Sequence, residues 1–154
     1  MDSSGQRPAS ASASAPGSAS EAGAGAGRLL VAVYGVFALA ATSRAGVQLA
    51  TRFGEAPIAY LLSAFSAVVY VVATVALARR GPGARRLAWL AVSTELAGVL
   101  LVGTFSLLAP QDFPRATVWS TYGIGYLFVP LVLPIVGLWW LRRSGQRTAS
   151  PAAP

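Results

Sequence analysis

The chain has 154 residues, of which 55% are hydrophobic and 11% are charged, and its formal net charge is +7. Soluble domains carry about 25% charged residues, and one core of this size could not enclose so much apolar surface. The chain contains no Cys and no His, which excludes disulfides, thiol nucleophiles and the commonest general base and metal ligand. All 12 basic residues are arginines. They bracket apolar runs and form no single basic face, so the charge does not indicate nucleic-acid binding.

Residues 1–27, MDSSGQRPASASASAPGSASEAGAGAG, are rich in Ser, Ala, Gly and Pro and contain no large apolar residue after Met1. Such a segment cannot bury enough surface to offset the entropy lost on ordering. We therefore expect residues 1–27 to form a disordered cytoplasmic tail, and residues 144–154 a second, short one.

Four apolar runs follow the tail, and each reaches or slightly exceeds the ~20 residues that a transmembrane helix needs. They cover about residues 29–51, 58–78, 87–109 and 118–141. The runs lack the strict alternation of a barrel wall. The predicted fold is all-α, a polytopic membrane protein with four transmembrane helices in an antiparallel bundle over residues 28–143. Pro130 and Pro134 lie inside the fourth run, where we expect a kink.

The arginines predict the orientation of these spans. The second connection and the C-terminal tail carry most of the flanking charge, namely Arg79, Arg80, Arg85, Arg86, Arg142, Arg143 and Arg147. The positive-inside rule then places both termini in the cytoplasm. Aromatic residues fit the two interfaces: Trp89, Trp139 and Trp140 inside, and Phe53, Tyr60, Phe113 and Trp119 outside. An ALA triplet at 38–40 could be a signal-peptidase site, but the apolar run continues beyond it, so we favour an uncleaved span.

Glu95 lies near the middle of the third span. A charged residue at this depth costs about 2.5–3.5 kcal/mol on insertion scales, so it is expected to face protein or water. Small residues share its helix face, namely Ala88, Ala91, Gly98 and Val102, which suits close helix packing. Glu95 either cements the bundle or serves as a proton- or cation-coupling site.

Arg44 is the obvious counterpart in the first span, where Arg44, Gln48 and Thr51 form a polar stripe toward the outer surface. Arg44 either reaches up to the lipid headgroups or points inward, as the tilt of Cβ atoms toward a helix N-terminus favours. Run midpoints put Arg44 and Glu95 roughly 10 Å apart along the bundle axis, and a small shift of boundaries closes this gap. We predict that they form a buried pair.

Further residues of the spans suit helix packing. A ridge of small side chains on the first span consists of Ala38, Thr42, Gly46 and Ala50. It would let another helix approach closely, from this chain or from a second copy. Tyr70 and Tyr122, on the second and fourth spans, are supporting polar candidates. Hydroxyl groups in such positions usually bond to their own helix or to a neighbouring one.

The segment VAVYGVFALAATSRAGVQLATRFGEAPIAYLLSAFSAVVYVVATVALA, residues 31–78, resembles the first half of small actinobacterial integral membrane proteins, which are usually described as uncharacterised. The strong use of Arg, Ala and Gly is likewise typical of high-GC bacterial genomes. The resemblance implies residence in the cytoplasmic membrane and brings no catalytic residue with it.

No nucleophile, metal or cofactor motif stands out, so we expect no enzyme, no cofactor and no metal site. The leading hypothesis is a non-enzymatic membrane component that binds a partner or serves as an accessory subunit, with the lipid bilayer and either a second copy or another membrane protein as its partners. The alternative is a small dimeric transporter or channel that uses Arg44 and Glu95, with unknown cargo. A transporter should hold Glu95 beside a water-accessible cavity, whereas a packing role predicts a filled interior.

Overall fold

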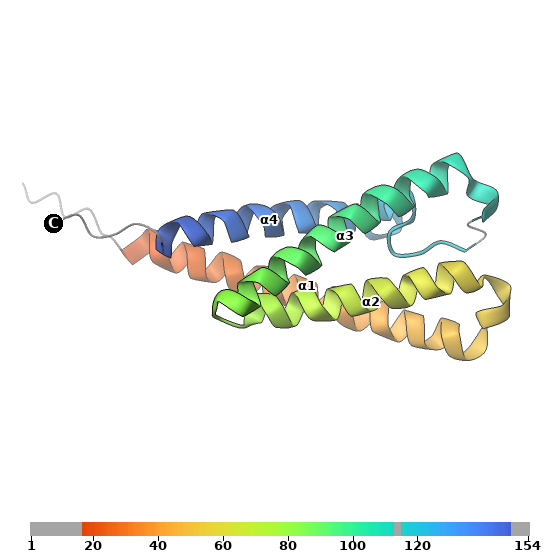
Figure 1. The fold of residues 1–154 in the computed structure, drawn as a ribbon, viewed down its shortest axis with the longest axis horizontal. Coiled ribbons are helices and arrows are strands. Elements are labelled where there is room, and N and C mark those ends of the chain that lie inside the picture. Colours follow the sequence, from red (N-terminus) through yellow and green to blue (C-terminus); the bar gives the residue numbers. More distant parts are fainter. Residues whose placement is uncertain (1–16, 113–114, 149–154) are drawn as a thin grey trace, which may run out of the picture.

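The computed structural model describes residues 17–112 and 115–148, and every regular element within these ranges is a helix (Figure 1). The long helices are α1 (Gly17–Thr51), α2 (Pro57–Ala78), α3 (Pro82–Leu108) and α4 (Val129–Thr148). Three short 3₁₀ helices lie between them, η1 (Phe53–Glu55), η2 (Pro110–Asp112) and η3 (Ser120–Tyr126). The all-α prediction is confirmed for the part of the chain that is described.

Proline and glycine mark the connections of the first three long helices. Pro57 and Pro82 occupy the first turns of α2 and α3, where the missing N–H of proline has no intrahelical partner to lose. Gly81, which precedes α3, has φ +117°, a conformation that L side chains rarely adopt. A very short turn can therefore reverse the chain between α2 and α3.

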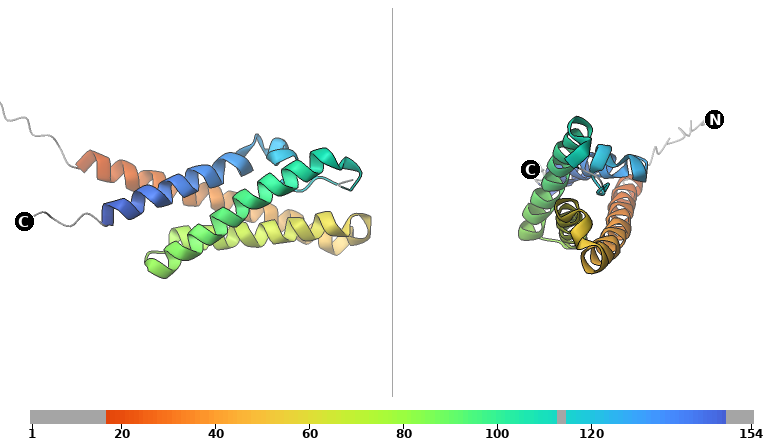
Figure 2. Two further views of the ribbon diagram at one scale, coloured as in Figure 1. Left: turned by 45° about the horizontal axis from the view of Figure 1, so that its top comes forward. Right: turned by 90° about the vertical axis from the view of Figure 1, so that its right-hand side faces the viewer.

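The long helices pack around a shared core. α1 packs most extensively against α2, α2 against α3, and α3 against both α4 and η3. The end-on view in Figure 2 shows the four long helices around a common centre. On α1 the buried line consists of Leu30, Tyr34, Ala38, Ala41 and Ala45. Its alanines keep the helix axes close, and Tyr34 supplies the bulk.

Three helices are long and apolar enough to cross a membrane, Gly23–Thr51, Pro57–Ala78 and Pro82–Leu108. A fourth candidate is a bent pair, Ser120–Tyr126 with Val129–Gly145, whose two parts meet at 100°. The chain therefore has the architecture of a multi-pass membrane protein, with three spans or with four if the bent pair counts as one.

The fourth predicted span is not one continuous helix, which corrects the expectation of a simple kink at its prolines. The break lies upstream of them: Thr121, Tyr122, Leu127 and Phe128 all have φ between +51° and +58°. Gly123 (φ +77°) packs so tightly on Pro130 that an added Cβ would lie 2.7 Å from the proline ring. The left-handed backbone costs roughly 1–2 kcal/mol per non-glycine residue, so packing must hold the break in place.

The ends of the helical region also differ from the expected boundaries. α1 already begins at Gly17, inside the segment predicted to be disordered, and residues 1–16 lie outside the described part. One contact that favours this extension is at Gly27, where an added Cβ would lie 2.8 Å from the Trp140 ring of α4. α4 likewise continues to Thr148, beyond the expected end of the fourth span, and residues 149–154 lie outside the described part.

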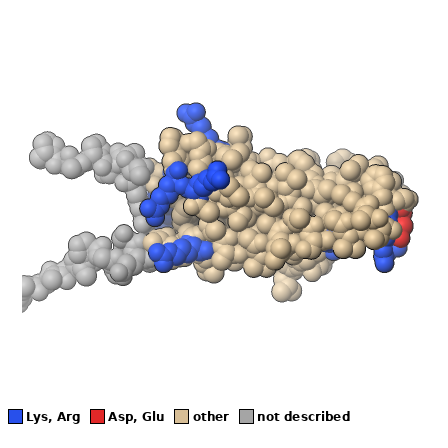
Figure 3. All heavy atoms as spheres, turned by 90° about the horizontal axis from the view of Figure 1, so that it is seen from below, with Lys and Arg blue, Asp and Glu red and all other residues tan. Residues whose placement is uncertain are grey.

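Charge is concentrated at the two ends of the molecule. Figure 3 shows arginines gathered at one end and a smaller mixed group of charges at the other. At the first end Arg142 and Arg143 lie over the rings of Trp89 and Trp139, at 5.8 and 4.1 Å from their centroids. At the opposite end Arg115 and Glu55 form an ion pair of 3.0 Å. The long apolar faces between the two ends match a lipid environment.

Candidate functional site

Glu95 is the central polar residue of the core. It lies on α3 with 0% of its surface exposed, and its Oε2 accepts a hydrogen bond of 2.7 Å from the hydroxyl of Tyr34 on α1. Tyr34 is also 0% exposed. The bond therefore joins two distant helices within the core, where a lost partner is expensive. The small residues Ala88 and Ala91 on the same face of α3 are buried as well.

Two further polar groups, from Tyr70 and Trp119, lie near the same carboxyl group. Glu95 Oε1, the hydroxyl of Tyr70 and the indole Nε1 of Trp119 are buried and have no hydrogen-bond partner among the described residues. Tyr70 nevertheless lies close enough to both Glu95 and Trp119 for an electrostatic interaction. The three groups are chemically complementary, because an indole N–H only donates, a hydroxyl does both and a carboxyl oxygen accepts. Tyr70 thus lies between an indole donor and a carboxyl acceptor.

Trp119 reaches this cluster because Gly98 leaves room for it. A Cβ added at Gly98 would lie 2.4 Å from the Trp119 ring, and the ring itself is only 1% exposed. The expectation that Trp119 belongs to the outer aromatic belt is therefore wrong. Phe65 of α2 meets the same ring edge-on, with 6.0 Å between centroids. Trp119, which directly precedes η3, thus packs this part of the chain against α2 and α3.

Arg44 points toward the break in the fourth apolar run. One guanidinium nitrogen donates to the hydroxyl of Tyr126 at 2.8 Å, and the other donates to the carbonyl oxygen of Ala116 at 2.7 Å. Its Nε is buried without a partner among the described residues. Arg44 therefore neither reaches for headgroups nor meets a carboxylate. It holds the two ends of the segment that contains η3.

The predicted pair of Arg44 and Glu95 is not formed. Aromatic rings lie between the two charges in a continuous series, Tyr34 to Tyr70 (6.3 Å between centroids), Tyr70 to Phe37 (5.7 Å) and Phe37 to Tyr126 (6.0 Å). These side chains occupy the space between Arg44 and Glu95 along the bundle axis. The sequence had led us to expect that a small shift of the helix boundaries would close this space. Instead, Glu95 accepts a hydrogen bond from Tyr34, and Arg44 donates one to Tyr126.

Arg44 and Gln48 of the polar stripe border a cavity of about 500 Å³ near the Arg115–Glu55 end, and Thr51 does not line it. The cavity is lined by Ser43, Arg44, Val47, Gln48, Arg52, Tyr60 and Arg115. Gln48 has a buried side-chain oxygen without a partner among the described residues. Thr51 donates to the carbonyl of Val47 in its own helix, at 2.7 Å. The stripe is thus a half-open polar hollow that is separate from Glu95.

The remaining predicted residues fall into two groups. In the small-residue ridge, Ala38 is buried within the bundle, whereas Thr42, Gly46 and Ala50 are exposed. A Cβ added at Gly46 would meet nothing within 4 Å. Tyr122 shares a hydrogen bond of 2.9 Å with Thr104 of α3. Only the part of the ridge from Thr42 to Ala50 faces away from the chain's own helices, and Tyr122 serves as an interhelical contact.

Sequence reasoning missed Tyr34 and the role of Trp119. Tyr34 could have been found, because it stands at helical spacing from Ala38 and Ala41 on what proves to be the buried line of α1. A lone hydroxyl in such a line needs a partner, and Glu95 is the natural one. Trp119 had no comparable signal, since its burial depends on the break in the chain that follows it.

No protein-family model, no curated protein and no solved structure matches this chain.

Proposed function

We propose that the protein is a non-enzymatic, integral component of the cytoplasmic membrane, with both termini in the cytoplasm, that acts by associating with a partner in the membrane. In this proposal Glu95 has a structural role. Its hydrogen bond to Tyr34 ties α1 to α3 and gives the bundle one packing arrangement, and the exposed face of α1 is free to meet the partner.

The observation that carries the proposal is the enclosure of Glu95. The residue is fully buried, and it lines neither the hollow beside Arg44 nor the two hollows at the arginine-rich end. Its surroundings include Val92 and Val99, one turn away on either side, and both are 0% exposed. A coupling site needs a path for water or ions to its carboxyl group. A filled interior favours the structural role over the alternative, a small dimeric transporter or channel.

The exposed part of the ridge supports the choice of α1 as the partner-binding face. Lipid tails are as apolar as leucine, so helices in a membrane associate where small residues permit close contact. Thr42, Gly46 and Ala50 present such a surface outward. The partner is either a second copy of the chain or another membrane protein with a matching small-residue face.

The chain contains no cysteine, which permits a clean accessibility test. Val99→Cys places a thiol one turn from Glu95, and Ser43→Cys places one in the open polar hollow. A water-soluble, membrane-impermeant thiol reagent should label the Ser43→Cys protein and leave the Val99→Cys protein unmodified. Equal labelling at both positions would mean that water reaches Glu95, and the transporter alternative would replace our proposal.

A second pair of cysteine variants tests the partner face. Gly46→Cys lies on the ridge, and Ala97→Cys is an exposed control on α3. Oxidation in native membranes should cross-link the Gly46→Cys chain into dimers if a second copy is the partner. Leucine at Gly46, but not at Ala97, should abolish association with whichever membrane protein co-purifies. Association that survives Gly46→Leu would exclude this face of α1.

A further inference from the structure

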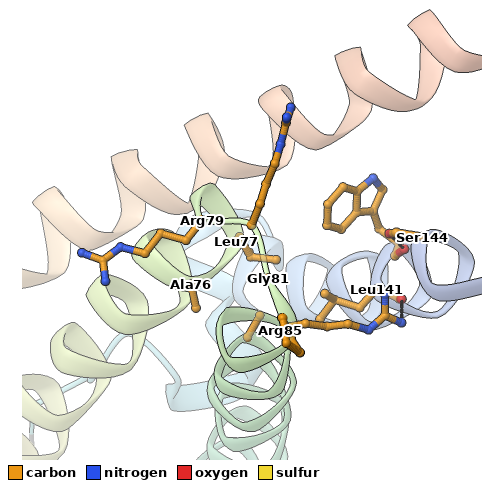
Figure 4. Close-up of a pocket in the computed structure, with 11 residues that line it drawn as sticks. Ala76, Leu77, Arg79, Gly81, Arg85, Leu141 and Ser144 are labelled. Carbon is orange, nitrogen blue, oxygen red and sulfur yellow. Dashed lines mark hydrogen bonds between the residues drawn. The ribbon is translucent and has the colours of Figure 1, made fainter. Parts of the chain in front are cut away.

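The end of the molecule opposite the Arg115–Glu55 pair contains two neighbouring hollows that share an arginine pair. The first, of about 550 Å³, lies between the end of α2, the start of α3 and α4 (Figure 4). Its lining consists of Ala76, Leu77, Arg79, Arg80, Gly81, Pro82, Arg85, Ala88, Trp140, Leu141 and Ser144. The second, of about 480 Å³, lies between α1 and α2 and is also bordered by Arg28. Leu77, Arg79, Arg80 and Trp140 line both hollows.

The arginines of this region differ in what they already bind. Arg85 donates to the carbonyl oxygen of Leu141 at 2.6 Å, so it braces α3 against α4 (Figure 4). The side chains of Arg79 and Arg80 are exposed and form no hydrogen bond or ion pair with any described residue. No acidic residue lines either hollow within the described ranges. Two adjacent cations without a counter-charge thus stand at the shared rim.

We propose that this arginine pair and the two hollows bind an anionic phospholipid, with its headgroup phosphate at Arg79 and Arg80. Guanidinium groups match the geometry of phosphate oxygens, and basic pockets between transmembrane helices bind anionic headgroups. The N-terminus of α3, which has no side-chain cap, lies beside the same rim and adds favourable field for an anion.

The apolar lining is what points to a lipid and not to a soluble phosphate. Leu77 and Trp140 line both hollows, and alanine, valine and leucine make up half of the residues that line only one of them. A soluble anion would gain nothing from these walls, whereas acyl chains bury apolar surface against them. A headgroup at the shared rim places one acyl chain beside each hollow, so the lipid spans α1, α2 and α4. This inference goes beyond the proposed function and does not depend on the partner.

The test measures lipid binding to the purified full chain in neutral detergent by native mass spectrometry. Phosphatidylglycerol and phosphatidylcholine with identical acyl chains are the two probes. We expect the anionic lipid to bind about 25-fold more tightly, since two arginines face its headgroup. Each arginine near a headgroup is worth about fivefold in affinity, so Arg80→Gln should weaken phosphatidylglycerol binding about fivefold and Arg79→Gln/Arg80→Gln about 25-fold. Binding of phosphatidylcholine should not change.

Matched controls separate a site from general attraction. Arg86→Gln/Arg143→Gln removes the same charge at the same end, from residues that line neither hollow, and should change binding less than twofold. An equal loss in both double variants, or none in either, would overturn the proposal. The single Arg80→Gln variant keeps the other arginines of the connection, so its orientation and folding are secure even if the double variant inserts poorly. Displacement of the lipid by equimolar inorganic phosphate or glycerol 3-phosphate would assign the site to a soluble phosphate and refute the lipid.

Discussion

The hydrogen bond between Tyr34 and Glu95 can be tested by a double-mutant cycle. Tyr34→Phe removes the donor of the 2.7 Å hydrogen bond to Glu95 Oε2. Glu95→Met replaces the carboxyl group by an apolar chain of similar length and flexibility. The double variant Tyr34→Phe/Glu95→Met converts the whole contact to an apolar one.

The magnitudes follow from burial. Both side chains are 0% exposed, so each single variant strands one polar group in the core. Stranding a buried donor or acceptor costs about 1–3 kcal/mol, whereas replacing both partners by apolar groups of similar shape is nearly neutral. Each single variant should therefore lower the free energy of unfolding by about 1–3 kcal/mol, and the double variant should cost about 1–2 kcal/mol less than the sum.

The assay is reversible unfolding in mixed micelles by increasing denaturing detergent, followed by circular dichroism and tryptophan fluorescence. The control is a second cycle with Arg44→Gln and Glu95→Met. These side chains have different partners and aromatic rings between them, so their effects should add to within about 0.5 kcal/mol. Additivity in the Tyr34 cycle together with strong coupling in the Arg44 cycle would refute our description of the core.

Three other outcomes can be checked independently. Gly98→Ala places a Cβ against the buried Trp119 ring and should destabilise the protein by about 1–3 kcal/mol. Its control, Gly46→Ala, adds a Cβ that meets nothing within 4 Å and should stabilise the protein by up to ~1 kcal/mol. Equal effects of the two variants in the same unfolding assay would count against the Trp119 packing. Leu127→Gly should raise stability by up to about 1 kcal/mol, because Leu127 is 87% exposed with φ +55° and glycine adopts that conformation without strain; a loss of stability there would show that the side chain itself is needed. A reporter active only outside the cytoplasm should be silent at the C-terminus and active after Gly54, as the arginine distribution predicts, and an active C-terminal fusion would overturn the orientation.

The first three long helices could be predicted well from sequence because their signals are local. Apolar length predicts a span, and Pro57, Gly81 and Pro82 mark the turns. The C-terminal ends of α1 and α2, at Thr51 and Ala78, coincide with the expected ends of the runs. The start of α1 could not be predicted in this way, because its glycines have poor helix propensity. The contact of Gly27 with Trp140 is invisible in the local sequence.

The break in the fourth run depends on tertiary contacts. Gly123 and Pro130 are visible in the sequence, but they permit a break without requiring left-handed backbone at Thr121 and Tyr122. Contacts with α3 stabilise that conformation: the backbone N–H of Thr121 donates to Ser106 Oγ at 2.7 Å, and Tyr122 shares its hydrogen bond with Thr104. Such partners are known only once the helices are docked, so sequence periodicity alone predicted a simple span.

In the candidate site, too, some features follow from the local sequence and others depend on tertiary contacts. Burial of Glu95 follows from one carboxyl group in a long apolar run, whereas helix geometry left the direction of the Arg44 side chain open. Which residue each one meets depends on the rotation of the helices about their axes. The pairing by opposite charge was therefore wrong, because tyrosines at the same depth were the nearer partners.

The contacts of Arg44 have a consequence for the order in which the chain is made. Its partners, Ala116 and Tyr126, lie 72 and 82 residues downstream, so they leave the ribosome long after α1. Until then the membrane holds a guanidinium group whose eventual acceptors do not yet exist. Until residue 116 is made, the Arg44 guanidinium can be solvated only by lipid headgroups or water. A chain that stops before residue 116 keeps this exposed cation, which gives membrane quality control a feature by which to recognise an unfinished protein.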